Sequence, residues 1–401
     1  MRVILGVGGG IAAYKSCDLA SRLVQQGHEL SVVMTQTASE FVGPLTFRAL
    51  SGRPVAIAAA DEPMGPLSHV RLARWAQVMI IAPLTQNLLA RLSLGLSSDM
   101  LSLVFQGFQG PIIVAPAMEP EMWLSPQTQK RMEDLLDQRQ VVVVGPNHGR
   151  MASGYMGPGR MAEPAEIIDA LWRLAKPKNL AGVSVVITAG PTWEHFDPVR
   201  LLTNPSTGSV GIALAKELSA RGAQVTVVHG PGVSTVKWPG IRYVATESAR
   251  DMLDAVAALM PAADVLIGAA AVSDFRPVHP ASQKMPKSAL EQAWLMEANP
   301  DIMAEMGRLY HDSKILIGFA AETHNVVASA LAKAERKRLH AIVANAVGKG
   351  LGFGEGEYQA AILRGGDVDG TLEPMTKERL AEKVAELVTD LHTARRMSDR
   401  V

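Results

Sequence analysis

Apolar residues along this chain gather in short continuous runs, separated by stretches with helical spacing. The runs of the first half predict strands at residues 3–7, 30–35, 78–83, 111–118 and 141–145. Runs that are apolar at every position are typical of parallel strands covered on both faces. Amphipathic stretches ending near residues 24, 51, 92 and 175 predict the covering helices. The pattern predicts a doubly wound α/β sheet, with binding sites at the carboxyl ends of its strands.

The second half repeats this architecture without repeating the sequence. Its apolar runs predict strands at residues 183–190, 224–230, 264–272, 314–322 and 340–346. Its amphipathic stretches predict helices at residues 213–222 and 252–260, and a final helix that begins near Thr376. Between the halves, at residues 176–182, the apolar periodicity breaks and Pro and Gly appear. We therefore expect two domains, residues 1–177 and residues 181–401.

The composition of the chain limits which classes of molecule it is expected to bind. The chain has 401 residues, with 39 Lys plus Arg against 39 Asp plus Glu, so no overall field attracts nucleic acid or an anionic membrane. Cys17 is the single cysteine, which excludes an intrachain disulfide framework and multi-cysteine metal sites. We expect Cys17 to be a small buried helix residue. We also expect a soluble cytoplasmic protein whose partners are small molecules or other subunits.

Two glycine-rich turns each follow an apolar strand and precede a helix, at residues 8–10 and residues 204–211. Such turns expose backbone N–H groups to a phosphate, so the chain is expected to bind two phosphorylated ligands. The first turn alone is compatible with NAD, with a flavin or with a tight turn. No acidic residue closes the second strand, where Thr35 and Ser39 lie instead. Hydroxyl groups there favour the mononucleotide FMN over NAD.

His69 is predicted at the start of a helix, one element before a turn that carries Ala82, Pro83, Thr85 and Asn87. A lone histidine at a helix start is more often a surface residue than a catalytic one. Its position next to that turn makes it a candidate at the rim of a flavin pocket.

At this point the sequence resembles known families. The first half contains the runs GGGIAAYK at 8–15, FVGPLTFRALSG at 41–52, SHVRLARWA at 68–76, APAMEPEMW at 115–123 and GPGRMAEP at 157–164. These resemble the flavin-dependent cysteine decarboxylases. The second half contains ITAGPTWEHFDPVRLLTNPSTG at 187–208, GAAAVSDFRP at 268–277, ANPDIM at 298–303, IGFAAET at 317–323 and IVANAV at 342–347. These resemble phosphopantothenate-cysteine ligase. In this order they are similar to the bifunctional decarboxylase/ligase family of coenzyme A biosynthesis.

The resemblance implies a flavodoxin-like first domain that binds FMN and a Rossmann-like second domain that uses CTP and Mg²⁺. In the second domain, the carboxylate of 4′-phosphopantothenate would attack the α-phosphate of CTP, and the amine of cysteine would capture the acyl-cytidylate. The first domain would then decarboxylate the product to 4′-phosphopantetheine. Family members assemble through the flavin domain, and the apolar stretches 88–96 and 100–105 suit either subunit contacts or core packing.

The resemblance also assigns candidate residues, and no metal ligand is assigned. The FMN candidates are Gly8, Gly9, Gly10, Ile11, Ala12, Thr35, Ser39, Ala82, Pro83, Thr85 and Asn87. The CTP candidates are Gly268, Ala269, Ala270, Asp274, Lys284, Ala298, Asn299, Pro300, Asp301, Phe319, Lys333 and Lys337. The catalytic candidates are His69, Asn204, Lys284, Ser153 and Glu119, and Arg200 is a candidate for holding an anionic group. Without the resemblance, Lys333 and Lys337 read as a solvated helix face with i,i+4 spacing.

The chain departs from the family pattern at several positions. In the second half, Trp193 and Ser209 replace an arginine and a lysine, Pro286 replaces a basic or polar residue, and Ala346 replaces an aspartate. In the first half, Ser153 occupies the place of the proton-donating cysteine, and a hydroxyl is a far poorer acid than a thiol. Glu119 occupies the place of the asparagine that binds the substrate carboxylate, and an ionised glutamate would repel that group.

These departures leave alternatives beside the bifunctional enzyme. One is a ligase whose first domain binds FMN but decarboxylates weakly. Another is a non-catalytic flavoprotein that acts as an interaction module. An NAD-dependent dehydrogenase is disfavoured, because no ribose-binding acid closes the second strand.

Overall fold

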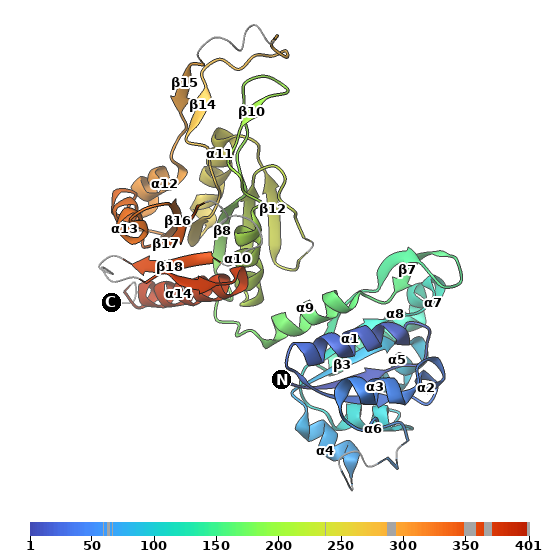
Figure 1. Cartoon of the computed structure of the whole chain (residues 1–401). Coiled ribbons are helices and arrows are strands. Elements are labelled where there is room, and N and C mark those ends of the chain that lie inside the picture. The colour runs from blue at the N-terminus through green and yellow to red at the C-terminus, as the bar shows by residue number, and fades with distance from the viewer. Residues whose placement is uncertain are drawn as a thin grey trace. The chain divides into compact units, whose positions relative to one another are not determined.

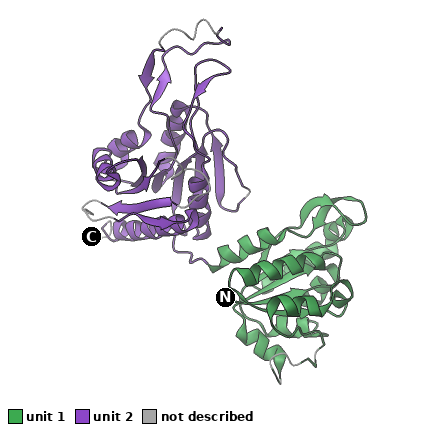
Figure 2. Ribbon diagram, viewed as in Figure 1, with its two compact units in different colours: residues 1–175 green, residues 176–401 purple. Residues whose placement is uncertain are grey.

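The computed structural model describes residues 1–398 except 59, 62–64, 66, 237, 287–293, 349–357 and 365–370. It divides into two compact units, Met1–Ala175 and Lys176–Val401, which Figure 2 shows in separate colours. Each unit is built from a largely parallel sheet with helices on both faces (Figure 1). The predicted α/β fold class is confirmed.

Unit 1 contains a parallel five-stranded sheet in the order β2-β1-β3-β4-β5. The strands are β1 (Arg2–Val7), β2 (Glu29–Met34), β3 (Val78–Leu84), β4 (Ile112–Pro116) and β5 (Val141–Val143). The helices are α1 (Ala13–Gln25), α2 (Ala38–Phe41), α3 (Pro44–Ser51), α4 (Ser68–Trp75), α5 (Gln86–Ser93), α6 (Met100–Gly107), α7 (Pro120–Leu124), α8 (Pro126–Gln138) and α9 (Pro164–Ala175). A two-stranded hairpin, β6 (Asn147–Arg150) and β7 (Met156–Arg160), lies outside this sheet. We call residues 147–160 the flap.

The continuous apolar runs of unit 1 are explained by burial on both faces of its sheet. Val3 and Leu5 of β1 belong to a core shared with α1, α3 and α9, whereas Ile4 belongs to a core shared with α4, α5 and α6. Residues that alternate along one strand therefore enter two different cores. The strand order 2-1-3-4-5 is the flavodoxin-like order, which reverses direction between β1 and β3 and binds ligands there.

Unit 2 contains an eight-stranded sheet in the order β12-β11-β8-β13-β16-β17-β18-β19. Its strands are β8 (Ser184–Ala189), β11 (Gln224–His229), β12 (Ile241–Ala245), β13 (Val265–Gly268), β16 (Ile315–Glu322), β17 (Ala341–Ala346), β18 (Tyr358–Arg364) and β19 (Glu373–Met375). Pairing is parallel from β12 to β17 and antiparallel beyond it. In chain order the six parallel strands run 3-2-1-4-5-6, the Rossmann order, and the switch point lies between β8 and β13.

Helices and two short ribbons complete unit 2. The helices are α10 (Ser209–Ala220), α11 (Ala249–Leu259), the 3₁₀ turn η1 (Met260–Ala262), α12 (Ile302–Tyr310), α13 (Val326–Arg336) and α14 (Lys377–Ser398). The ribbons pair β9 (Glu194–His195) with β10 (Leu201–Leu202), and β14 (Phe275–Pro277) with β15 (Met296–Ala298). In Figure 1 both ribbons project from the same end of the unit 2 sheet.

The start of unit 2 is fixed by a buried group of charges. Lys176 Nζ lies 3.0 Å from Glu217 of α10 and 3.1 Å from Glu382 of α14. The carboxylate of Glu217 also accepts from Arg221 at 2.7 Å, and both of these side chains are almost fully buried. The first residue after α9 is thereby attached to two helices of unit 2.

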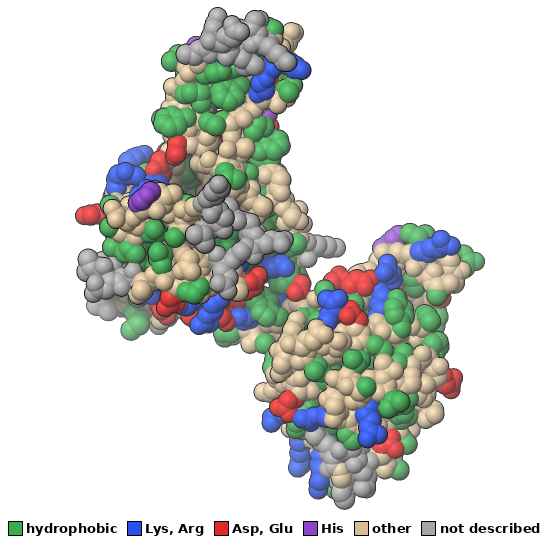
Figure 3. Space-filling model, viewed as in Figure 1, with side chains coloured by type: hydrophobic (Ala, Val, Ile, Leu, Met, Phe, Trp, Pro, Cys, Tyr) green, Lys and Arg blue, Asp and Glu red, His purple; other side chains and the backbone are tan. Residues whose placement is uncertain are grey.

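Charged groups of both signs lie side by side over the visible face of each unit (Figure 3), in keeping with their equal numbers. In the part of the chain that the structure describes, no helix combines the length and apolar character needed to cross a membrane. The apolar stretches of α5 and α6 pack into the core of unit 1, and Leu94 and Leu96 after α5 remain exposed.

Candidate functional site

A cavity of about 680 Å³ lies at the carboxyl ends of β1 and β3 in unit 1, the switch point of its sheet. Its size is in the range of small-molecule sites. The predicted FMN residues that line it are Gly9, Gly10, Ile11, Ala12, Thr35, Pro83, Thr85 and Asn87. The structure therefore brings together residues from the glycine turn, from the end of β2 and from the turn after β3.

The glycines of the first turn are required by close approach of the backbone. A Cβ at Gly8 would lie 2.4 Å from the carbonyl oxygen of Pro83, and one at Gly9 would lie 2.5 Å from Cβ of Thr37. Gly8 also donates its N–H to that Pro83 oxygen at 3.2 Å. Helix α1 begins directly after this turn with no side-chain cap and no acidic residue in its first turn. The positive end of its dipole is thus available to an anion.

Five predicted residues of unit 1 are not among the described residues that line this cavity: Gly8, Ser39, Ala82, His69 and Ser153. Gly8 bonds to the end of β3, as described above. Ser39 Oγ donates to the carbonyl of Gln36 at 2.6 Å, and the carbonyl of buried Ala82 accepts from Ser16 at 2.6 Å. His69 is half-buried in the first turn of α4, and it is not among the described residues that line the cavity.

Sequence reasoning missed the positive charges of this cavity. Lys15, Arg91, Arg150 and Arg160 all line it. Lys15 is nearly buried and donates to Glu163 at 2.9 Å and to the carbonyl of Met161 at 3.2 Å. Lys15 is the last residue of the GGGIAAYK run, so one of these four cations could have been predicted from that run.

Glu119 lines this cavity, and Ser153, which is not among the described lining residues, contacts its carboxylate. Ser153 lies in the flap turn, where Met151 donates its N–H to the carbonyl of Tyr155 at 2.8 Å. Its hydroxyl donates to Glu119 Oε2 at 2.8 Å, and Glu119 lines the cavity just before α7. The two positions that depart from the family pattern are therefore in direct contact with each other.

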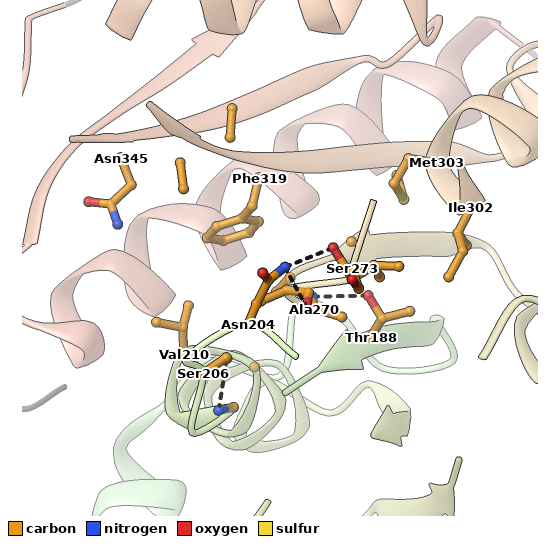
Figure 4. Close-up of a pocket in the computed structure, with 18 of the residues that line it drawn as sticks. Thr188, Asn204, Ser206, Val210, Ala270, Ser273, Ile302, Met303, Phe319 and Asn345 are labelled. Atoms are coloured by element: carbon orange, nitrogen blue, oxygen red, sulfur yellow. Dashed lines mark hydrogen bonds between the residues drawn. The ribbon is translucent and has the colours of Figure 1, made fainter. Parts of the chain in front are cut away.

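A second cavity, of about 880 Å³, lies at the carboxyl ends of β8 and β13 in unit 2, again at the switch point (Figure 4). The predicted residues that line it are Asn204, Gly268, Ala269, Ala270, Asp274, Asn299, Pro300, Asp301, Phe319 and Lys337. Residues that sequence reasoning did not assign also line it, among them Thr188, Ser206, Thr207, Gly208, Ser273, Asn345 and Tyr358. Several of these lie within the quoted runs 187–208 and 342–347.

The turn before α10 forms one wall of this second cavity. Gly208 has φ of 72° and is the N-cap residue of α10, with no side-chain cap. A Cβ there would lie 2.7 Å from Val233 and 3.1 Å from the backbone nitrogen of Gly190. Gly211 allows α10 to pack on β8, because its Cβ would lie 2.5 Å from Cβ of Ala189. The turn can therefore present the α10 N-terminus to an anion.

Hydrogen bonds hold the other walls in position (Figure 4). The side-chain amide of Asn204 donates to the carbonyl oxygens of Ala271 at 3.3 Å and Val272 at 3.0 Å. Asn299 donates through its side-chain amide to the carbonyl of Ser273 at 2.9 Å. These amides link the α10 turn and the segment after β15 to the segment that follows β13.

Ser209, which stands in the place of a family lysine, contacts Tyr358 in this cavity. Burial raises the pKa of the Tyr358 phenol, and its hydrogen bond with Ser209 opposes that rise. The first turn of α10 is thus joined to the antiparallel strand β18.

The two candidate lysines of the α13 segment have different surroundings. Lys337, at the end of α13, lines the cavity and lies 2.9 Å from Asp301. Lys333 pairs with Glu322 at the end of β16 and is not among the described lining residues. Ala298, the last residue of β15, also lies outside that lining. One of the two lysines is therefore placed for contact with a ligand in this cavity.

Lys284 is exposed on the segment that follows β14, and it is not among the described cavity-lining residues. The backbone of its neighbour Met285 donates to Asp197 Oδ2 at 3.1 Å and accepts from Arg200 Nη1 at 3.1 Å. Burial raises the pKa of the Asp197 carboxyl, but hydrogen bonds from Val199, Met285 and Arg200 outweigh it and lower the pKa to about 2. Asp197 and Arg200 thereby attach the Lys284 segment to the β9–β10 ribbon.

Among the described residues, no group of three or more His, Cys, Asp or Glu side chains is arranged to hold a metal ion. Asp274 and Asp301 are the carboxylates of the unit 2 cavity lining.

Comparisons with known proteins cover nearly the whole chain. Residues 1–176 match the Flavoprotein family, and residues 180–391 match the family described as DNA/pantothenate metabolism flavoprotein C-terminal domain. The chain is similar to the coenzyme A biosynthesis bifunctional protein CoaBC of Vibrio parahaemolyticus, with 40% identity over 97% of this chain and 98% of that protein. CoaBC of Escherichia coli K12 is 38% identical over 97% of each chain. A crystal structure of the C-terminal domain of CoaBC is 32% identical over 54% of this chain and 99% of that one, with a TM-score of 0.45.

Proposed function

The chain belongs to the family of coenzyme A biosynthesis bifunctional proteins, and on that premise we propose that it joins 4′-phosphopantothenate to cysteine in unit 2 and decarboxylates the product in unit 1. The observation that carries this proposal is a cavity at the switch point of each sheet, both lined by the residues through which the sequence resembles the family. Each cavity has the glycine turn and helix N-terminus that an anionic ligand requires.

In unit 2 we assign CTP to the cavity between the α10 turn and the segments after β13 and β15. The small side chains of Ala269 and Ala270 let the nucleotide approach the backbone after β13, and Lys337 supplies positive charge. Gly268 makes room for Met303, whose sulfur would lie 2.4 Å from a Cβ at that position. Mg²⁺ commonly binds through one or two carboxylates together with substrate phosphates and water. Asp274 of the cavity lining suits that role.

The ligation proceeds in two balanced steps. The carboxylate of 4′-phosphopantothenate attacks the α-phosphorus of CTP and releases pyrophosphate, and the amine of cysteine then attacks the acyl carbon and releases CMP. Positive groups lower the barrier by neutralising charge that develops on the phosphates. We assign that task to Lys284. We assign contact with the acyl intermediate to Asn204, which lines the cavity and whose amide nitrogen is held by the carbonyls of Ala271 and Val272.

In unit 1 we assign FMN to the cavity beside the glycine turn. The close approach at Gly8 and Gly9 and the uncapped α1 N-terminus fit the phosphate of a mononucleotide. When bound, the flavin supplies the oxidation and reduction that make loss of CO₂ possible. The residues of the chain then bind the substrate and supply the proton, with Arg150 available to an anionic substrate. Arg160 also lines the cavity, where it pairs with Glu163 at 2.8 Å.

We propose that the protein works in the cytoplasm as a homo-oligomer assembled through unit 1. Leu94 and Leu96 after α5 are exposed by 58% and 51%, which supports a subunit contact there. Sedimentation of the purified chain and of a Leu94→Lys variant tests this contact, and an unchanged mass in the variant would contradict it.

The ligase proposal is tested by pyrophosphate release with each nucleoside triphosphate in turn. Release should require CTP, 4′-phosphopantothenate and cysteine together. Lys337→Gln should raise the KM for CTP, whereas the matched variant Lys333→Gln should change it little, because Lys333 faces Glu322. Equal effects of the two variants would contradict the assigned CTP position.

A further inference from the structure

A decarboxylase must deliver a proton to the carbon that loses CO₂, because a carbon–hydrogen bond replaces the bond to the carboxylate. That proton comes from a positioned acid within hydrogen-bond reach. The unit 1 cavity must therefore contain such an acid, if the proposed function holds.

Glu119 is the natural source of that proton. Among the described residues that line the unit 1 cavity, it alone carries a carboxyl group. The cations of the described lining are Lys15, Arg91, Arg150 and Arg160, and guanidinium groups do not release protons in proteins. Lys15 is engaged by Glu163.

Ser153 connects this carboxyl group to the flap. Its hydroxyl lies 2.8 Å from Glu119 Oε2. The second strand of the flap is attached to the segment before Glu119, since Met118 donates its N–H to the carbonyl of Gly159 at 3.0 Å. A Cβ at Gly157 would lie 2.7 Å from Pro120, so the flap strand and the start of α7 are in close contact. These contacts between the flap and the segment at the start of α7 keep the Ser153 hydroxyl beside the Glu119 carboxyl group.

We propose that Glu119 and Ser153 together deliver the proton of the decarboxylation, with Ser153 as the donor to carbon and Glu119 as its source. This inference rests on the proposed decarboxylase function. A serine hydroxyl by itself is too weak an acid for the task. In the structure Ser153 donates to Glu119 Oε2. A protonated Glu119 reverses this hydrogen bond and removes the limit, because the hydroxyl then loses one proton while it gains another.

The bonds of this step balance without a change of oxidation state. The Ser153 O–H bond breaks as the carbon–hydrogen bond forms, and the Glu119 proton moves to Ser153 Oγ. Ser153 ends neutral, and Glu119 ends as a carboxylate that takes its next proton from water.

The test is a double-mutant cycle on the full-length FMN-loaded chain, supplied directly with phosphopantothenoylcysteine. Glu119→Gln should slow product formation by about 10²-fold, the scale of one general-acid contribution. In a Ser153→Cys background the same substitution should cost less than about fivefold, because a thiol supplies its own proton. Glu121→Gln is the matched control, since Glu121 is exposed on α7 and outside the described cavity lining.

Hydrogen exchange of residues 147–160, measured without substrate, separates proton delivery from a purely structural role. Gln at position 119 still offers an oxygen to Ser153, so exchange should match the unsubstituted chain while the rate of product formation falls. The proposed proton delivery by Glu119 and Ser153 would be refuted if hydrogen exchange of the flap increased as much as the rate of product formation fell. It would also be refuted if Glu119→Gln cost the same in the Ser153 and Ser153→Cys backgrounds. If the unsubstituted chain ligates its substrates without any release of CO₂, the proposed decarboxylase function is wrong. The proposed role of Glu119 and Ser153 is then wrong as well.

Discussion

Replacement of Gly8 by alanine tests the FMN cradle at its tightest contact. The added Cβ would lie 2.4 Å from the carbonyl oxygen of Pro83, a backbone atom, and 3.2 Å from the side chain of Leu88. Real Cβ atoms do not come so close to an oxygen, so the turn and the end of β3 must separate. Overpacking of this kind costs about 1–3 kcal/mol. The free protein can relieve the strain by moving the turn, but FMN binds only when the turn is in its original position. The strain therefore makes the free energy of FMN binding less favourable.

We therefore expect Gly8→Ala to weaken FMN binding by roughly 5- to 150-fold, since about 1.4 kcal/mol is a factor of ten. Titration of the apoprotein, followed by quenching of flavin fluorescence, measures the dissociation constant. Gly43→Ala is the matched control, because Gly43 is not among the described cavity-lining residues and a Cβ there would meet nothing within 4 Å. Its effect should stay within about twofold. Equal losses at the two glycines, or no loss at Gly8, would refute the reasoning.

Four further predictions concern unit 2. Lys284→Gln should lower the kcat of pyrophosphate release by about 10²-fold without change in thermal stability, and an unchanged kcat would exclude the assigned role. Asp197→Asn should lower the same kcat, because it weakens the bond to Met285 that holds the Lys284 segment; full activity would show that this attachment is dispensable. Glu217→Ala leaves Arg221 buried without its 2.7 Å partner and should cost about 3–5 kcal/mol in urea unfolding, and a loss below about 1 kcal/mol would contradict the buried pair. Burial and the nearby His311 and Arg395 lower the pKa of His340 from 6.5 to about 4, so its contribution to stability is complete above pH 6.5 and is lost as the pH falls towards 4. His340→Gln should flatten unit 2 stability in that window, and an unaltered pH dependence would contradict it.

The strands were predictable because burial on both faces leaves a continuous apolar run. Every strand predicted in the sequence, from residues 3–7 to residues 340–346, is confirmed as part of a sheet. The glycine turns were predictable for a related reason, since close approach at Gly8 and Gly211 excludes any side chain.

The short ribbons β9–β10 and β14–β15 were not predictable from periodicity. Each strand has two or three residues, too few to show an alternation. They are held by contacts between residues far apart in the chain, such as the hydrogen bond from Met285 to Asp197. The antiparallel strands β18 and β19 lie beyond the last predicted strand and were missed as well.

Some candidate residues line the cavities, and others are held outside them by local hydrogen bonds. Residues in the turns after parallel strands, such as Gly9 and Asn204, line the cavities because strand ends converge there. Ser39 and Ala82 lie close in sequence to lining residues, but local hydrogen bonds use their polar atoms. The contact between Ser153 and Glu119 joins positions 34 apart in the chain, so only the folded structure could bring it to light.

The central claim, that one chain carries both activities, is tested most directly in a single reaction mixture. The purified chain is incubated with FMN, 4′-phosphopantothenate, cysteine, CTP and Mg²⁺, and the products are followed over time by mass spectrometry. The account predicts that phosphopantothenoylcysteine appears first with CMP and pyrophosphate, and is then converted to 4′-phosphopantetheine and CO₂. Phosphopantothenoylcysteine that accumulates without release of CO₂, or a mixture in which no cysteine-derived product forms, would contradict it.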